Sequence, residues 1–123
     1  MIDALPWIGL GALGALGALG RFMVDGAVSA RWPSDFPFGT LAVNLSGGFA
    51  LGVLVGLGVG GDAILIFGTG LLGGYTTFST WMVEAQRLGE DGEWRLMWLN
   101  LFAPMLLGVA TTGLGWVAGA ALT

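Results

Sequence analysis

Near the centre of the chain lies the segment Gly70-Leu71-Leu72-Gly73-Gly74-Tyr75-Thr76-Thr77-Phe78-Ser79-Thr80, in which paired glycines precede four hydroxyl residues within five positions. The segment falls inside an uncharged run from Ala63 to Val83. Backbone freed from helical hydrogen bonds in a membrane is tolerated only where protein or a water-filled cavity satisfies it. We therefore predict a helix that is broken near the middle of the bilayer. In the alternative, the Ser and Thr hydroxyls bond back to their own helix, which stays unbroken.

Long uncharged runs surround this segment and predict a membrane protein. Hydrophobic residues make up 55% of the 123 residues and charged residues only 10%, against about 25% charged in an average soluble domain. A membrane-spanning helix needs roughly 20 residues, and the uncharged runs cover residues 4–20, 36–61, 63–83 and 96–123. We predict an all-α fold in which residues 1–123 form one domain of four transmembrane helices, at roughly 4–30, 37–59, 63–86 and 95–121.

Composition also excludes several functional classes. Cys and His are absent from the sequence, which removes disulfides, thiolate metal sites and the commonest general base. The net charge is −4 and Lys is absent, so the chain lacks the positive surface on which nucleic-acid binding depends. We therefore expect no enzymatic activity and no nucleic-acid partner, and we expect the lipid bilayer to surround the chain.

Polar side chains deep in the second predicted span form a candidate site. Thr40 and Asn44 lie four residues apart, so they share one face of a helix. An amide in hydrocarbon is costly without partners and by default faces the interior of the bundle. Two interpretations stay open: a hydrogen bond that joins helices, worth ~0.6 kcal/mol on average, or a site that binds a ligand.

The ligand in the second interpretation is an ion of either sign. The amide and hydroxyl groups of Asn44, Ser79 and Thr80 can donate hydrogen bonds to a small anion, and the positive ring edge of Phe78 can add to them. Phe78 and Trp81 lie three residues apart, so one helix face can present two rings to an ion, or both to lipid. Loosened carbonyls in a broken helix suit a cation instead.

Two functions from other classes also fit a small four-span chain. The first is a proton-coupled exporter, for which a carboxylate inside a span is the expected feature. The acidic residues nearest the spans flank them instead and are expected to be solvated: Asp25, Asp35, Asp62 and Glu84. The second is a membrane scaffold in which the polar residues only hold helices together.

The arginines indicate an orientation in the membrane. All four lie on one side of the predicted spans, at Arg21, Arg31, Arg87 and Arg95. By the positive-inside rule, this asymmetry places both termini outside.

Three motifs in order resemble those of the Fluc (CrcB-type) fluoride channels over nearly the whole chain. They are Gly17-Ala18-Leu19-Gly20-Arg21-Phe22, then Pro37-Phe38-Gly39-Thr40-Leu41-Ala42-Val43-Asn44 with Gly47 and Phe49, then the segment 70–80 continued to Glu84. The resemblance implies a passive channel that exports fluoride down its electrochemical gradient across a bacterial plasma (inner) membrane. It also implies a dual-topology dimer with two pores, formed with an antiparallel second copy or an oppositely oriented paralogue.

The resemblance also implies roles for single residues. The carbonyls of Gly73 and Thr76 match those that hold a structural Na⁺ at the dimer centre, and Arg21 matches an arginine with a structural role. The residues implied along the fluoride path are Asn44, Thr40, Phe78, Trp81, Ser79, Thr80, Asn100 and Thr112.

This chain departs from the family pattern at three positions. Trp81 stands where the second pore aromatic is usually Phe, and its indole adds an N–H donor. In the fourth span, alignment on Gly108 puts Asn100 and Pro104 where the family often has Tyr and then Ser, with Thr112 further along the same face. Asn100 can donate a hydrogen bond, whereas Pro104 cannot and is expected to kink the helix.

Overall fold

The computed structural model describes residues 3–123, and these form helices without a β-strand. Glycines at positive φ shape the turns on either side of the interrupted helix, namely Gly58, Gly61 and Gly92. Glycine adopts this left-handed conformation without the steric cost that a Cβ imposes. The elements in chain order are α1 (Leu5–Arg31), α2 (Phe38–Gly56), α3 (Gly61–Ala63), the π-helix η1 (Ile64–Leu72), α4 (Gly73–Tyr75), α5 (Ser79–Glu90) and α6 (Trp94–Ala121).

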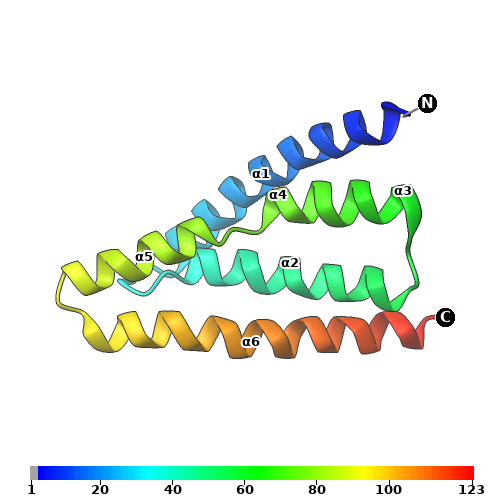
Figure 1. The fold of residues 1–123 in the computed structure, drawn as a ribbon. Helices are drawn as coiled ribbons and strands as arrows, with labels where there is room; N and C mark the ends of the chain where they lie inside the picture. The colour runs from blue at the N-terminus through cyan, green and yellow to red at the C-terminus, as the bar shows by residue number, and fades with distance from the viewer. Residues whose placement is uncertain (1–2) are drawn as a thin grey trace.

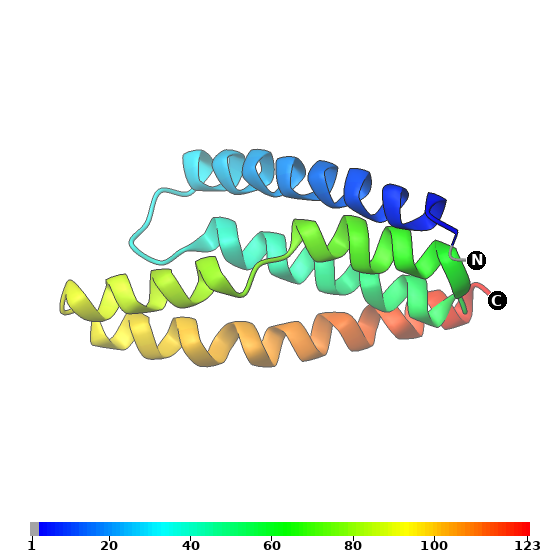
Figure 2. The same cartoon turned by 45° about the horizontal axis from the view of Figure 1, so that its top comes forward.

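The helices lie lengthwise beside one another, and the chain runs back and forth along the bundle (Figures 1 and 2). Both termini and the α2–α3 turn lie at one end, whereas the α1–α2 loop and the α5–α6 turn lie at the other. Three helices, α1, α2 and α6, are long and apolar enough to cross a membrane. α3, η1 and α4 follow one another as a single rod that ends before α5. The predicted all-helical membrane fold with a broken helix is confirmed.

The surface of the bundle is strongly apolar, and the buried core is small. Few large apolar side chains are buried, Val43 and Leu88 among them, whereas Phe22, Leu106 and Val109 are each more than two-thirds exposed. A soluble chain would aggregate through such a surface. In a bilayer the same side chains contact lipid tails, which are equally apolar.

Glycines let the helix backbones approach closely where hydrophobic burial is small. A Cβ added to Gly115 of α6 would collide with the carbonyl oxygen of Phe49 in α2, and one added to Gly17 of α1 with that of Leu71 in η1. Interfaces between membrane helices are enriched in small residues because lipid supplies no hydrophobic drive for association. Close van der Waals packing therefore holds α6 on α2 and α1 on the broken helix.

Substitution of Gly115 by Ala is expected to destabilise the bundle by about 1–3 kcal/mol, the usual cost of overpacking. Gly113→Ala is the matched control on the same helix, because a Cβ at Gly113 meets nothing within 4 Å. The check is thermal unfolding of the detergent-solubilised protein, followed by tryptophan fluorescence. Equal melting temperatures for the two variants would contradict the close packing of α2 and α6.

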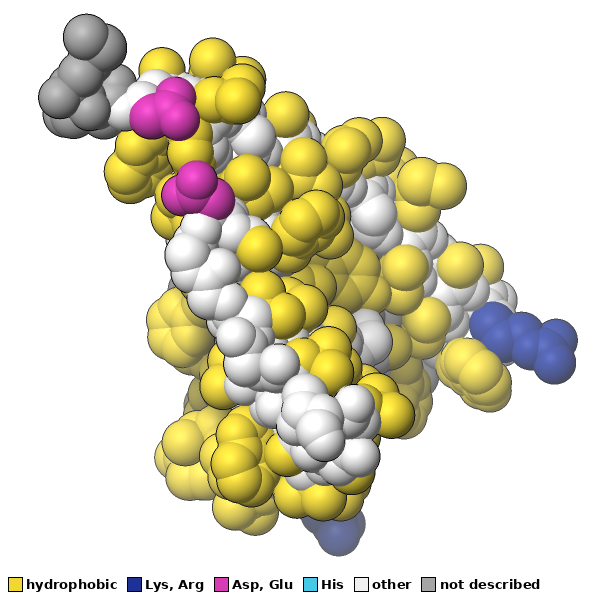
Figure 3. All heavy atoms as spheres, turned by 90° about the vertical axis from the view of Figure 1, so that its right-hand side faces the viewer, with side chains coloured by type: hydrophobic (Ala, Val, Ile, Leu, Met, Phe, Trp, Pro, Cys, Tyr) yellow, Lys and Arg dark blue, Asp and Glu magenta, His cyan; other side chains and the backbone are white. Residues whose placement is uncertain are grey.

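Charge is distributed unequally between the two ends of the bundle. The end that carries both termini shows acidic side chains, while arginine side chains appear only at the edges of this view (Figure 3). Arg31 closes α1, and Arg87 and Arg95 flank the α5–α6 turn. These three arginines thus lie at the end opposite the termini, whereas Arg21, which was predicted on the same side, lies inside α1 and not at its end.

Candidate functional site

The break lies between α4 and α5, and a side chain of α2 closes it. α4 ends at Tyr75, Thr76 is extended with φ −81° and ψ 159°, and α5 begins at Ser79. The Asn44 amide nitrogen donates to the carbonyl oxygen of Thr77, and the amide oxygen accepts the Thr77 N–H, each over 2.8 Å. One side chain therefore satisfies both backbone groups of Thr77, which lie partly buried in an apolar bundle and have no helical partners there.

Two carbonyls of the broken helix are left without the backbone donors that a continuous helix would give them. In a continuous helix the Gly73 carbonyl would accept the N–H of Thr77, but that N–H is bound to Asn44. The Thr76 carbonyl would accept the N–H of Thr80, which instead lies 3.2 Å from the Thr77 hydroxyl oxygen. The two carbonyls that the family resemblance implies as cation ligands are thus released from the helix.

The Thr77 hydroxyl organises the first turn of α5. It accepts the Thr80 N–H and donates to the Thr80 hydroxyl oxygen, each over 3.2 Å, in the manner of a helix N-cap. The Ser79 hydroxyl oxygen lies 3.4 Å from the same group. Three hydroxyls therefore gather on one side of the break.

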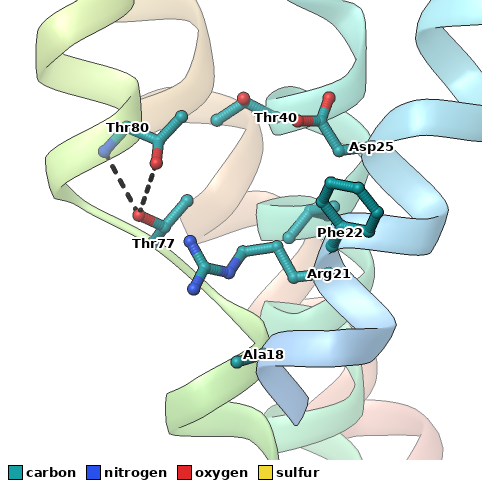
Figure 4. Close-up of a pocket in the computed structure, with 8 residues that line it drawn as sticks. Ala18, Arg21, Phe22, Asp25, Thr40, Thr77 and Thr80 are labelled. Carbon is teal, nitrogen blue, oxygen red and sulfur yellow. Dashed lines mark hydrogen bonds between the residues drawn. The ribbon is translucent and has the colours of Figure 1, made fainter. Parts of the chain in front are cut away.

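A cavity of about 190 Å³ opens beside these hydroxyls, lined from α1, α2 and the start of α5 (Figure 4). At about 30 Å³ per water molecule, it has room for several. The Arg21 side chain extends from α1 toward Thr77, and its Nε is buried without a hydrogen-bond partner in the described part of the chain. An unpaired donor on a permanently charged group favours water or an anion beside it, and the Asp25 carboxylate, which lines the same cavity, carries the opposite charge.

Thr40 and Glu84 are paired across α2 and α5. Thr40 is 3% exposed, and its hydroxyl donates to a Glu84 carboxylate oxygen over 2.5 Å. Glu84 is half-buried, so the expectation that it is a solvated span end is wrong. Because Thr80 and Glu84 lie four residues apart on α5, the carboxylate lies one turn away from the hydroxyls of the break.

Phe78 and Trp81 form an aromatic pair beside the break. Their ring centroids are 5.7 Å apart and their planes are perpendicular, the edge-to-face arrangement that aromatic quadrupoles favour. Phe78 is 70% exposed in the single chain, whereas the Trp81 indole N–H donates to the carbonyl oxygen of Asn100 in α6. One ring is therefore free to face a ligand or a neighbour, and the other is held by the bundle.

Sequence comparison places this chain in a known family. The family model described as CrcB-like protein, Camphor Resistance (CrcB), matches residues 8–116. The chain belongs to the CrcB family. The resemblance predicted from three motifs is therefore confirmed.

Individual CrcB relatives cover most of this chain. Fluoride-specific ion channel FluC 2 of Mycobacterium tuberculosis (strain ATCC 25618 / H37Rv) is 48% identical over 113 residues, which are 91% of this chain and 90% of the relative. FluC 1 of Leifsonia xyli subsp. xyli is 40% identical over 119 residues, 93% of this chain and 82% of the relative. FluC 2 of Haloarcula marismortui is 46% identical over 96 residues, 78% of each. All are named as channels, in agreement with the prediction that the chain is not an enzyme.

The predicted site residues do not all lie beside the break. Thr112 lies further along α6 and close to α2. A Cβ added to Gly48 of α2 would lie 2.8 Å from the Thr112 hydroxyl oxygen. Asn100 is 1% exposed, and its amide nitrogen lies 3.4 Å from the Trp81 carbonyl oxygen, to which it donates. Both residues thus face neighbouring helices within the chain.

Two residues of the candidate site were not predicted from the sequence. Thr77 is the residue that Asn44 holds and the one that caps α5, and its signal was the spacing of two threonines three apart where a helix restarts. Glu84 was recognised only as a trailing acid, because nothing local to it indicates that Thr40 of another helix donates to it.

Proposed function

We propose that the chain is a passive, fluoride-selective channel of the bacterial plasma (inner) membrane, through which fluoride leaves down its electrochemical gradient. The observation that carries this proposal is the clamped break, where Asn44 holds a helix open inside an apolar bundle. Hydroxyls, a cavity lined by Arg21 and a ring edge lie beside it. The names of the CrcB relatives support fluoride as the ion.

A second chain is needed to enclose the path. We take the α3–η1–α4 rod with α5 as the fourth crossing, and this crossing leaves Phe78 70% exposed at the surface. A path bounded by Phe78 therefore has an open side in one chain. An antiparallel partner, either a second copy or an oppositely oriented paralogue, would cover it and produce a dual-topology dimer with two pores.

The break carbonyls fit a structural Na⁺ at the centre of such a dimer. The carbonyls of Gly73 and Thr76 have lost their helical donors to Asn44 and Thr77, and carbonyls loosened in this way suit a cation. With the same carbonyls of the partner chain, they would hold the ion. Its fixed positive charge would offset part of the desolvation cost of an anion nearby.

Fluoride would exchange its water for protein donors in steps. The cavity beside Arg21 receives the hydrated ion, and the Asn44 amide, which spends one N–H on Thr77, has a second to donate. The Ser79 hydroxyl and the Phe78 ring edge complete the set. Because these donors are neutral groups, they hold the ion weakly enough for it to leave, as conduction requires. Pore width and donor density then select against chloride.

Efflux from liposomes tests this function directly. Vesicles loaded with potassium fluoride and containing the purified chain are expected to release fluoride rapidly once a potassium ionophore is added, as measured with a fluoride electrode. Chloride-loaded vesicles are the matched control and should retain their anion. Release from the purified chain alone would identify a second copy as the partner, whereas a dimer that stays silent with fluoride would exclude the channel.

The same vesicles distinguish a channel from the proton-coupled exporter. A pH gradient imposed at zero membrane potential should leave the initial fluoride efflux of a passive channel unchanged. Efflux that follows the pH gradient and disappears on Asp25→Asn would instead favour the exporter.

A further inference from the structure

Pro104 leaves an unpaired acceptor in the middle of α6. It lies inside the helix Trp94–Ala121, and proline has no N–H to donate to the carbonyl four residues earlier. That carbonyl belongs to Asn100, which is 1% exposed. Water cannot reach it, and a buried carbonyl without a donor costs about 1–3 kcal/mol.

Trp81 supplies the missing donor from another helix. Its indole N–H points to the Asn100 carbonyl oxygen over 2.5 Å. In return, the Asn100 amide nitrogen donates to the Trp81 backbone carbonyl oxygen over 3.4 Å. Membrane helices tolerate internal proline where a neighbouring helix satisfies the freed carbonyl, and here one side chain of α5 does so.

We propose that Pro104 is a positioning residue for Trp81: by freeing the Asn100 carbonyl, it fixes the indole ring in its place against Phe78. The Trp81 ring is held by α6 and stands perpendicular to the Phe78 ring, with centroids 5.7 Å apart. The indole N–H is consumed in this contact, so Trp81 offers an anion its ring edge and not its strongest donor. The functional part of this inference rests on the proposed fluoride channel; the structural part does not.

A merely kinking role for Pro104 makes a different prediction. A kink acts on α6 whatever side chain stands at position 81, so the effects of changing the two residues would add. If Pro104 acts by freeing an acceptor for the indole, each change removes the same contact, and the two effects are coupled.

The test is a double-mutant cycle of Pro104→Ala and Trp81→Phe, with Gly108→Ala as the control on α6 because its new Cβ meets nothing within 4 Å. Trp81→Phe keeps an aromatic ring but orphans the Asn100 carbonyl, so it is expected to lower the melting temperature by about 4 °C or more. In the Pro104→Ala background, the new backbone N–H pairs with that carbonyl, and the same substitution should cost clearly less. Equal costs in both backgrounds would overturn the proposal.

Two further readouts separate this inference from the proposed function. In protein labelled with ¹⁵N-tryptophan, the indole resonance that Trp81→Phe removes is assigned to Trp81, and its N–H should exchange slowly with solvent in the parent and faster in Pro104→Ala. An unchanged exchange rate would overturn the proposal that Pro104 positions Trp81.

Fluoride efflux should fall about fivefold in Pro104→Ala, the equivalent of one net hydrogen bond. When Phe already stands at position 81, Pro104→Ala should cause no further fall. Absence of efflux in the parent would refute the channel, while the melting and exchange data would still test whether Pro104 positions Trp81.

Discussion

Replacing Asn44 by Asp is expected to reduce fluoride efflux at least about a hundredfold, the equivalent of about 2.7 kcal/mol in the barrier. The Asn44 amide donates to one backbone group of Thr77 and accepts from the other. A carboxylate keeps the acceptor but loses the donor, so an oxygen faces the Thr77 carbonyl oxygen with no proton between them. The added negative charge also repels an anion at the break.

Efflux from liposomes measures this effect, and size-exclusion chromatography of the variant shows whether the protein still assembles. Ser46→Ala is the control on the same helix, because the Ser46 hydroxyl bonds to the Val43 carbonyl and to Tyr75, away from Thr77. It should conduct at nearly the parental rate. Parental efflux from Asn44→Asp would show that the clamp on the break is not needed for conduction.

Replacing Phe78 by Ile is the second large effect, and we expect efflux to fall at least about tenfold while the protein stays assembled. Phe78 is 70% exposed, and Trp81 is its aromatic partner within the chain, so a smaller apolar residue should disturb folding little. Its ring edge, however, carries positive potential toward an anion, which an aliphatic side chain lacks. Tenfold in rate corresponds to about 1.4 kcal/mol, which lies within the ~0.5–1.5 kcal/mol of an aromatic contact.

Phe102→Ile provides a matched control for this substitution. Phe102 is also an exposed ring paired with a tryptophan, Trp98, at a centroid distance of 5.9 Å, but it lies on α6 away from the break. Melting temperature and elution volume of both variants should match the parent. Equal efflux from the two would show that no ring edge at position 78 is required.

Local composition predicted the interruption of the third long helix before its partners were known. Paired glycines followed by clustered hydroxyls weaken a helix at that point, and the structure places the break at Thr76–Phe78, inside the predicted segment. Asn44 was expected to face the bundle interior because an amide is costly in lipid. The interhelical hydrogen bond considered for it does exist, but its partner is the backbone of the break.

The partners of these groups could not be read from local patterns. A sequence shows which groups lack a local donor or acceptor, because helical hydrogen bonding follows from neighbours four residues away. It does not show which distant group supplies the missing one, since that depends on how helices cross. Asn44 with Thr77, Thr40 with Glu84, and Trp81 with Asn100 are all pairs of this kind, separated by 33, 44 and 19 residues.

The membrane location, the helical class and the position of the break thus follow from the sequence alone, since each reflects a cost that lipid imposes on charge or on unpaired backbone. Tertiary packing decided how each cost is met. It made Asn44 a clamp, turned Glu84 from a solvated end into a hydrogen-bond acceptor, and gave the carbonyl freed by Pro104 an indole donor. Close contacts at glycines bring the helices near enough for short side chains to reach across.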